Sequence, residues 1–286
     1  MPVEPPVASP RTLAEAYVLL AEAPHRPVAG GTDLLVQITG ELGDAPDRVL
    51  DIWHLDELRG IRMESNALLL GALTTYAEIR RSPLIAEFVP AFAEAAATIG
   101  AAQIQNRGTI GGNVMNASPA GDMLPLLLAC DAQLVAGTAG GERWIPVREF
   151  WPSYRKTALE PAELLLRISI PLPVGRQLRY RKVGTRRAQA ISKVVMALAW
   201  QPAADADGAW RDVHLALGSV APTPVRAPAT EAAIEGAAPS EAIADRAAST
   251  LAGELSPIDD VRSSADYRRA VAARVLHRLI RDEGGW

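Results

Sequence analysis

Hydrophobic positions recur with two different spacings in the first 175 residues, which indicates strands mixed with short helices. Residues 132–138 and 143–147 are apolar runs on either side of a glycine-rich turn, and they predict a hairpin. Further strands are expected at residues 27–29, 47–53, 66–72 and 163–171. Helices are expected at residues 12–24, 32–40, 75–82 and 90–100. Thr12 with Glu15 forms a capping box at the start of the first, and Thr75 with Glu78 caps the third.

The pattern changes near residue 176, after which strand-like runs precede helices. Strands are expected at residues 177–184, 191–200 and 210–218. The last helix, at 264–283, carries Tyr267, Val271, Val275 and Leu279 at four-residue spacing, which predicts its buried face. Strands and helices are mixed before residue 176, whereas strands precede helices after it. This arrangement indicates an α+β chain with domains at 1–175 and 176–286.

Composition and charge narrow the function classes. The 286 residues are 49% hydrophobic and 22% charged, with a net charge of −4, so no broad basic surface for nucleic acid is expected. The single cysteine, Cys130, follows an apolar run and is expected to be buried; one cysteine excludes an internal disulfide and an iron–sulfur cluster held by this chain. No signal peptide or transmembrane segment is recognisable, so a cytoplasmic location is expected.

Two glycine-rich stretches are the main candidates for a binding site. In "PVAGGTDLL", Gly30 and Gly31 lie between a predicted strand and a predicted helix. In "NRGTIGGNVMNASPAGD", residues 106–122, four glycines and several small polar residues predict one long loop. Turns of this kind expose backbone N–H groups to phosphate oxygens and let a ligand approach the main chain. Two of them in one domain favour one elongated, polyanionic ligand such as a diphosphate.

Structural interpretations of the same residues stay open. A double glycine between strand and helix is also a common tight turn, and neither a G-x-G-x-x-G nor a P-loop pattern is present. Asp33 would repel a phosphate, so its side chain is expected to turn away and accept N–H groups of the helix. Asp122 fits either a ligand hydroxyl or an ordinary turn.

At these residues the chain resembles a known family. "AGGTDLL" with "TIGGNVMNASPAGD" resembles the paired signatures of the FAD-binding (medium) subunit of molybdenum hydroxylases, the family of the carbon monoxide dehydrogenase medium subunit and the xanthine dehydrogenase FAD domain. "LALGSVAPTPVRAPATEAAIEG" is similar to the C-terminal domain of that family. The resemblance implies a FAD-binding domain of the PCMH/vanillyl-alcohol-oxidase type with subdomains at about 1–57 and 58–175. A smaller α+β domain, a three-stranded antiparallel sheet plus helices, would follow.

The resemblance also implies which residues hold a non-covalent FAD. Asp122 is expected at the ADP end, Leu165 near the adenine, and Gly100 beside the flavin ring. Lys182 is expected at the isoalloxazine edge, where its alternative is a solvated lysine on a basic strand. Some relatives have acidic residues where this chain has Gln189 and Ala190, so the role of that segment stays open. The full expected set is Val28, Ala29, Gly30, Gly31, Thr32, Asp33, Leu34, Gly100, Thr109, Gly112, Asn113, Asn116, Asp122, Leu165 and Lys182, with no catalytic acid or base and no metal ligand.

Electron transfer is the function that the resemblance implies. A large subunit would carry the molybdenum cofactor and oxidise the substrate, and a small subunit would carry two 2Fe–2S clusters. This medium subunit would pass the electrons through FAD to an external acceptor, in a dimer of heterotrimers that is cytoplasmic or membrane-associated through the complex. Two alternatives stay open: a self-contained flavin-dependent oxidoreductase with its own substrate pocket, and a non-enzymatic binding module whose glycines only form turns.

Overall fold

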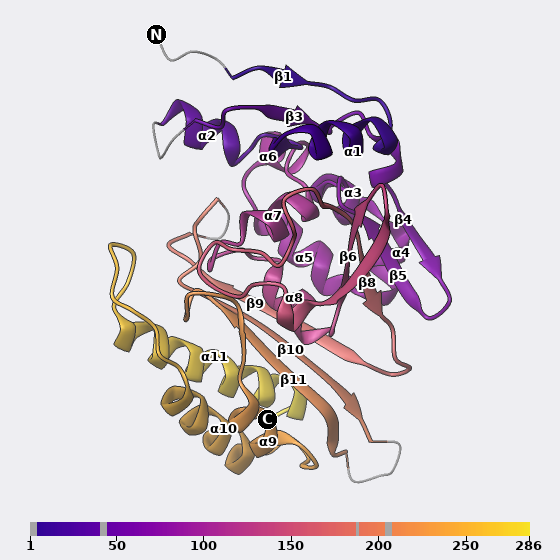
Figure 1. Cartoon of the computed structure of the whole chain (residues 1–286). Coiled ribbons are helices and arrows are strands. Elements are labelled where there is room, and N and C mark those ends of the chain that lie inside the picture. The colour runs from indigo at the N-terminus through magenta and orange to yellow at the C-terminus, as the bar shows by residue number, and fades with distance from the viewer. Residues whose placement is uncertain (1–4, 41–44, 187–188, 204–207) are drawn as a thin grey trace.

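The computed structural model describes residues 5–40, 45–186, 189–203 and 208–286, and it is a mixed helix-and-sheet fold (Figure 1). A small parallel sheet at the N-terminal end consists of β1 (Val7–Ala8), β3 (Val49–Asp51) and β2 (Arg26–Val28). Helices α1 (Leu13–Glu22) and α2 (Leu34–Thr39) accompany it. The expected capping box at α1 forms only in part: the Thr12 side chain accepts from Glu15 N, but the Glu15 carboxylate bonds to Arg11 N instead of Thr12 N.

The second sheet is antiparallel, in the order β4-β5-β8-β6-β7. The predicted hairpin is confirmed as β6 (Gln133–Thr138) and β7 (Gly141–Pro146). Strands β5 (Ala67–Gly71) and β8 (Leu164–Pro171) lie where the sequence indicates, whereas β4 (Ile61–Glu64) has mostly exposed side chains and no clear pattern. The helical elements of this region are η1 (Asp56–Leu58), α3 (Tyr76–Arg81), α4 (Pro83–Phe88), α5 (Pro90–Thr98), α6 (Ala102–Gln105), α7 (Ile110–Asn116), α8 (Leu124–Ala129) and η2 (Val147–Glu149).

The C-terminal sheet contains the three predicted antiparallel strands, β9 (Gln177–Val183), β10 (Val194–Pro202) and β11 (Trp210–Gly218). A two-residue strand, β12 (Val225–Arg226), extends it at the β11 edge and is too short to leave a periodic signal. Helices α9 (Pro228–Ile234), α10 (Glu241–Glu254) and α11 (Ala265–Gly284) follow and cover one face (Figure 1).

The predicted buried face of α11 is confirmed in part. Leu279 is buried, and Val271 and Val275 are partly buried and pack against the C-terminal core. Tyr267, in contrast, is 43% exposed, and the residue after it, Arg268, is buried together with Ala272 and Leu276. The sequence does not reveal this neighbouring row, because an interior arginine breaks the apolar pattern by which a buried face is recognised.

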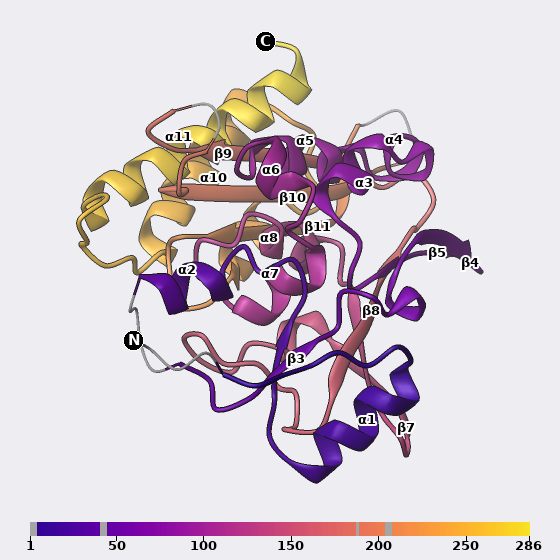
Figure 2. The same ribbon diagram turned by 90° about the horizontal axis from the view of Figure 1, so that it is seen from above.

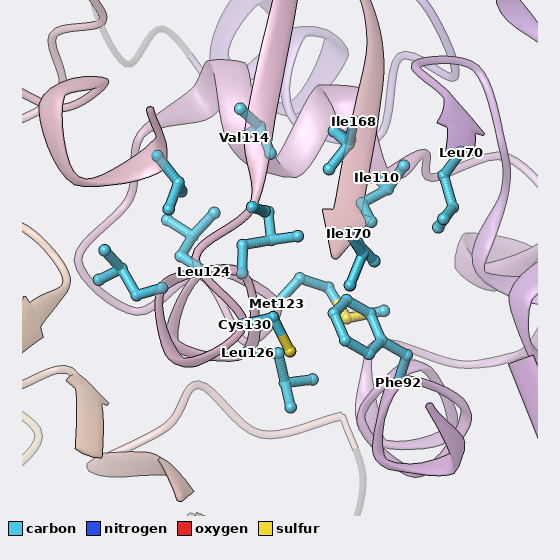
Figure 3. Packing of buried hydrophobic residues seen from close by; sticks show 14 of the residues in the cluster. Leu70, Phe92, Ile110, Val114, Met123, Leu124, Leu126, Cys130, Ile168 and Ile170 are labelled. Carbon is cyan, nitrogen blue, oxygen red and sulfur yellow. The ribbon is translucent and has the colours of Figure 1, made fainter. Parts of the chain in front are cut away.

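Strand β10 joins the two halves of the molecule because both of its faces are buried. Val195, Ala197 and Ala199 belong to the core that includes α5 and α8, whereas Met196 and Leu198 pack with the C-terminal helices. In Figure 1 the strands β9 and β10 lie between α5 and α11, and Figure 2 shows the same ribbon from above. The larger core is built around Phe92, Met123, Leu126, Ile168 and Ile170 and includes Cys130, whose predicted burial is confirmed (Figure 3).

The described helices include none with the length and apolar character that a membrane crossing requires.

Candidate functional site

The double-glycine turn between β2 and α2 is shaped by contact with the second glycine-rich stretch. A Cβ atom on Gly30 would lie 1.7 Å from the carbonyl oxygen of Arg107, so only glycine lets the two segments touch here. Gly31 has a φ of +74°, a left-handed conformation that glycine adopts without strain. The first glycine is therefore needed for the approach of two backbones, and the second for the direction of the turn.

The second stretch is not the continuous loop that the sequence predicts, because residues 110–116 form the short helix α7. Thr109 caps it by accepting a hydrogen bond from Gly112 N at 3.0 Å. A Cβ on Gly111 would lie 2.4 Å from the carbonyl oxygen of Ala72, whereas one on Gly112 would meet only Thr109 Oγ1, at 3.0 Å. Gly111 is therefore required by packing, while Gly112 presents open backbone to the adjacent cleft. The glycines had concealed this helix, since they weaken helix propensity.

The two stretches form one wall of an elongated cleft with two sections. A narrow section of 140 Å³ lies against the first turn, α7 and the start of β8, and is lined by Gly30, Gly112 and Leu165 among others. A wide section of 810 Å³ extends to β9 and the C-terminal domain and is lined by Gly100, Asp122 and Lys182. The two sections share five lining residues, Thr32, Asp33, Tyr76, Asn113 and Asn116, and therefore adjoin each other.

Every residue that the sequence proposed for the site lies on this cleft. The narrow section contains the members at 28–31, 34, 109, 112 and 165, and the wide section those at 100, 122 and 182. The members at 32, 33, 113 and 116 border both. Gln189 and Ala190, where the chain departs from some relatives, also line the wide section.

Asp33 does not cap α2, contrary to expectation. Its Oδ1 instead accepts a hydrogen bond from Asn116 Nδ2 at 2.9 Å, and Asn116 Oδ1 accepts from Arg155 Nη1 at 3.0 Å. Burial raises the pKa of the Asp33 carboxyl, and the positive charge of Arg155 opposes that shift. The acid thus bonds across the cleft rather than to its own helix, consistent with α2 being six residues long with no buried side chain.

Asp122 and Lys182 form a buried ion pair between the two domains. Lys182 Nζ lies 2.6 Å from Asp122 Oδ2 and 3.3 Å from the carbonyl oxygen of Thr98, and the two side chains are only 6% and 10% exposed. Burial raises the pKa of Asp122, and the ammonium of Lys182 works against that rise. Lys182 is therefore not a solvated surface lysine, and Asp122 is more than a turn residue.

Three buried polar atoms of cleft-lining residues have no hydrogen-bond partner within the described structure. Asp122 Oδ1 and Asn113 Oδ1 are acceptors, and Arg268 Nε is a donor. Buried acceptors are normally satisfied, so each is available to a donor group of a bound molecule.

Sequence reasoning missed three contributors to the cleft. Tyr76, just after the Thr75 cap, borders both sections, and burial raises the pKa of its phenol well above the usual value, so it stays neutral. Gln105 is buried and donates to the carbonyl oxygens of Ala97 and Ile99, which fixes the segment before Gly100. Arg155 reaches the cleft from a distant loop. No local pattern marks any of them, because each acts through a contact distant in sequence or through burial.

Among the described residues, no three or more His, Cys, Asp or Glu side chains gather as a set that could hold a metal ion.

Comparison with known proteins identifies both halves of the chain. Residues 3–173 match the family model described as the FAD binding domain in molybdopterin dehydrogenase, and residues 179–282 match the CO dehydrogenase flavoprotein C-terminal domain. The chain is 33% identical to the glyceraldehyde dehydrogenase medium chain of Sulfolobus acidocaldarius over 258 residues, 90% of each protein. It is 36% identical to the nicotinate dehydrogenase FAD-subunit of Eubacterium barkeri over 193 residues, 65% of each.

A solved structure agrees. Carbon monoxide dehydrogenase from Hydrogenophaga pseudoflava superimposes with a TM-score of 0.90 at 31% identity, covering 97% of this chain and 96% of that one.

Proposed function

This chain belongs to the family of FAD-binding domains in molybdopterin dehydrogenases, whose members are subunits of oxidoreductases, and on that premise we propose that it is an electron relay. Its FAD receives electrons from a partner subunit and passes them to an external acceptor. The observation that carries the proposal is the cleft with its two adjoining sections, lined by two glycine stretches of one domain and, at its far end, by Lys182 on β9 of the other.

The two sections suit the two halves of an extended FAD. The narrow section, between the Gly30–Gly31 turn, Gly112 and Leu165, takes the ADP half, with the diphosphate at the turn. The wide section, with Gly100 and Lys182, takes the flavin ring, since it alone has the volume for three fused rings.

One assignment from the sequence changes as a result. Asp122 was expected at the ADP end and Lys182 at the ring edge, yet their charged atoms lie 2.6 Å apart. An extended FAD cannot place its two ends at one ion pair, so we assign both residues to the flavin half. There the unpartnered Asp122 Oδ1 would accept a hydrogen bond from the cofactor.

The chain's own groups suit a flavin whose redox properties are adjusted by neighbouring side chains. FAD supplies the acceptance and release of electrons. Lys182 holds a positive charge at the ring end, which stabilises negative charge on reduced flavin. Tyr76 remains a neutral hydrogen-bonding group beside the cleft. The described residues of the cleft therefore suit a site that binds and orients FAD.

The remaining parts of the proposal concern the complex. Relatives are named medium chain and FAD-subunit of dehydrogenases with different substrates, glyceraldehyde and nicotinate, which supports substrate choice by another chain. We propose a large subunit with the molybdenum cofactor, a small subunit with two 2Fe–2S clusters, and assembly as a cytoplasmic dimer of heterotrimers. Domain limits at about 57 and 175 belong to the same proposal.

Rapid-mixing absorbance of the flavin tests the relay. The purified chain loaded with FAD should show no substrate-dependent bleaching, and the complete complex should bleach within its turnover time. The substrate is that of the large subunit that co-purifies. Bleaching by the chain alone would replace the relay with a self-contained flavin oxidoreductase. If the chain bound no FAD at all, the remaining interpretation would be a non-enzymatic binding module.

A further inference from the structure

Arg155 is held in an unusual backbone conformation beside the cleft. It lies at the tip of a turn closed by an antiparallel bridge between Ser153 and Lys156, and its φ is +54°. This left-handed region disfavours residues other than glycine, and departures of this kind are frequent where a side chain must be aimed at a functional site. The turn aims Arg155 at Asn116.

A chain of hydrogen bonds leads from Arg155 to the first glycine turn. The guanidinium donates to Asn116 Oδ1 at 3.0 Å, and Asn116 Nδ2 donates to Asp33 Oδ1 at 2.9 Å. Asp33 and Asn116 lie on the border of both cleft sections, and Arg155 lines the wide one. The three residues come from positions far apart in the sequence and meet where the two sections join.

The carboxylate in this chain of bonds is in an unfavourable place for a polyanion. Asp33 lies two residues after Gly31, at the turn to which the diphosphate is assigned, and its carboxylate does not cap α2. Like charges at short range raise the free energy of binding unless a cation compensates. Burial raises the pKa of the Asp33 carboxyl, and the positive charge of Arg155, joined to it through Asn116, acts in the opposite direction.

We propose that Arg155 is a positioning residue for the cofactor: through Asn116 it neutralises Asp33, so that a diphosphate binds next to a carboxylate. The inference rests on the proposed position of the diphosphate at the first glycine turn. It explains how a turn with an acid accepts an anionic ligand: in addition to Arg26, which lines the narrow section, a second cation comes from a turn more than a hundred residues later.

A double-mutant cycle on the full-length chain, freed of FAD and titrated with FAD, tests this. Quenching of flavin fluorescence on binding gives the Kd for FAD of four proteins: the wild type, Arg155→Gln, Asp33→Asn and the double variant. Arg155→Gln should raise Kd about tenfold. Asp33→Asn should lower Kd, and in its background Arg155→Gln should change Kd less than about twofold. Lys156→Gln, which removes a charge from the same turn, should leave Kd unchanged.

Salt dependence separates neutralisation from a structural role. Potassium chloride screens the repulsion between Asp33 and the diphosphate, so added salt should recover part of the affinity that Arg155→Gln loses. Arg155→Lys should keep most of the wild-type affinity.

Several results would overturn the proposal. An equal loss from Arg155→Gln in both backgrounds would mean direct contact with FAD or a structural role. No loss in either would make Arg155 an ordinary surface arginine, and loss of binding by Asp33→Asn alone would make the carboxylate itself a ligand. A wild-type chain that binds no FAD would instead refute the proposed function.

Discussion

The ammonium of Lys182 on β9 lies 2.6 Å from the carboxylate of Asp122, sixty positions earlier in the chain, and both side chains are almost fully buried. The pair connects the FAD-binding and C-terminal domains at the wide end of the cleft. A buried pair of this kind has two separable consequences, one for stability and one for the flavin.

Removal of one partner should destabilise the chain more than removal of both. Lys182→Met leaves Asp122 buried without its cation, which typically costs about 3–5 kcal/mol. The double variant Lys182→Met with Asp122→Leu should recover part of that loss because no uncompensated charge remains. Urea unfolding of the FAD-free chain measures the free energies of the wild type, the two single variants Lys182→Met and Asp122→Leu, and the double variant. Strict additivity of the two single effects would show that the pair is not coupled.

The flavin in the assembled complex should become harder to reduce when Lys182 is replaced. Lys182→Met removes a positive charge near the ring and leaves the Asp122 carboxylate unpaired, and both changes disfavour anionic reduced flavin. An effect of about 1–3 kcal/mol is expected for a charge-assisted contact. A redox titration of the flavin measures it, with Lys156→Met as the control. Equal midpoint potentials in wild type and Lys182→Met would remove Lys182 from the flavin site.

Substitutions of the adjacent glycines Gly111 and Gly112 in α7 should have different effects, the first on stability and the second on FAD binding. Gly112→Val should fold and yet be purified largely without flavin, because the new side chain enters the cleft; a loss of at least about 10²-fold in affinity is expected. Gly111→Ala should lose stability instead, since its Cβ would meet the Ala72 carbonyl oxygen at 2.4 Å. Thermal unfolding and flavin content distinguish the two effects. Full flavin occupancy in Gly112→Val would mean that the helix only supports the fold.

The FAD should be released without breaking a covalent bond. Among the described lining residues of either section there is no histidine or cysteine, and His25, next to the narrow section, hydrogen-bonds through Nδ1 to the carbonyl oxygen of Ala23. Acid precipitation should therefore leave the yellow colour in the supernatant. Colour in the protein pellet would identify a covalent tether, and His25→Ala would then show whether that residue forms it.

Acid should weaken the fold in part through Glu163, which lines the narrow section. A hydrogen-bonded ion pair with Arg143 at 2.6 Å lowers the pKa of the Glu163 carboxyl. The folded state therefore holds its proton less tightly than the unfolded state, where the pKa is about 4.3. This contribution is fully present above that value and is lost as pH falls through the lowered folded pKa. Glu163→Gln should flatten the decline in Tm between pH 6 and pH 3. Glu160→Gln is the control, and an identical decline in both variants would contradict the assignment.

The sequence determined the order of the main elements and the two glycine stretches. These follow from local rules: short apolar runs bounded by turn residues give β5, β8 and the β6–β7 hairpin, and adjacent glycines mark places where backbone must come close. Helix α7 was not predicted, because the glycines that allow backbone segments to come close also weaken helix propensity.

Only the tertiary structure decided what the individual groups do. It showed that Gly30 is required by the Arg107 carbonyl, that Gly112 faces open space, and that Asp122 and Lys182 share one end of the cleft. It brought Arg155 to Asp33 through Asn116 and turned Arg268 into the core. Each of these depends on contacts between residues far apart in the chain. Periodicity and spacing carry information over only a few neighbouring positions, and long-range contacts are fixed by the packing of whole elements.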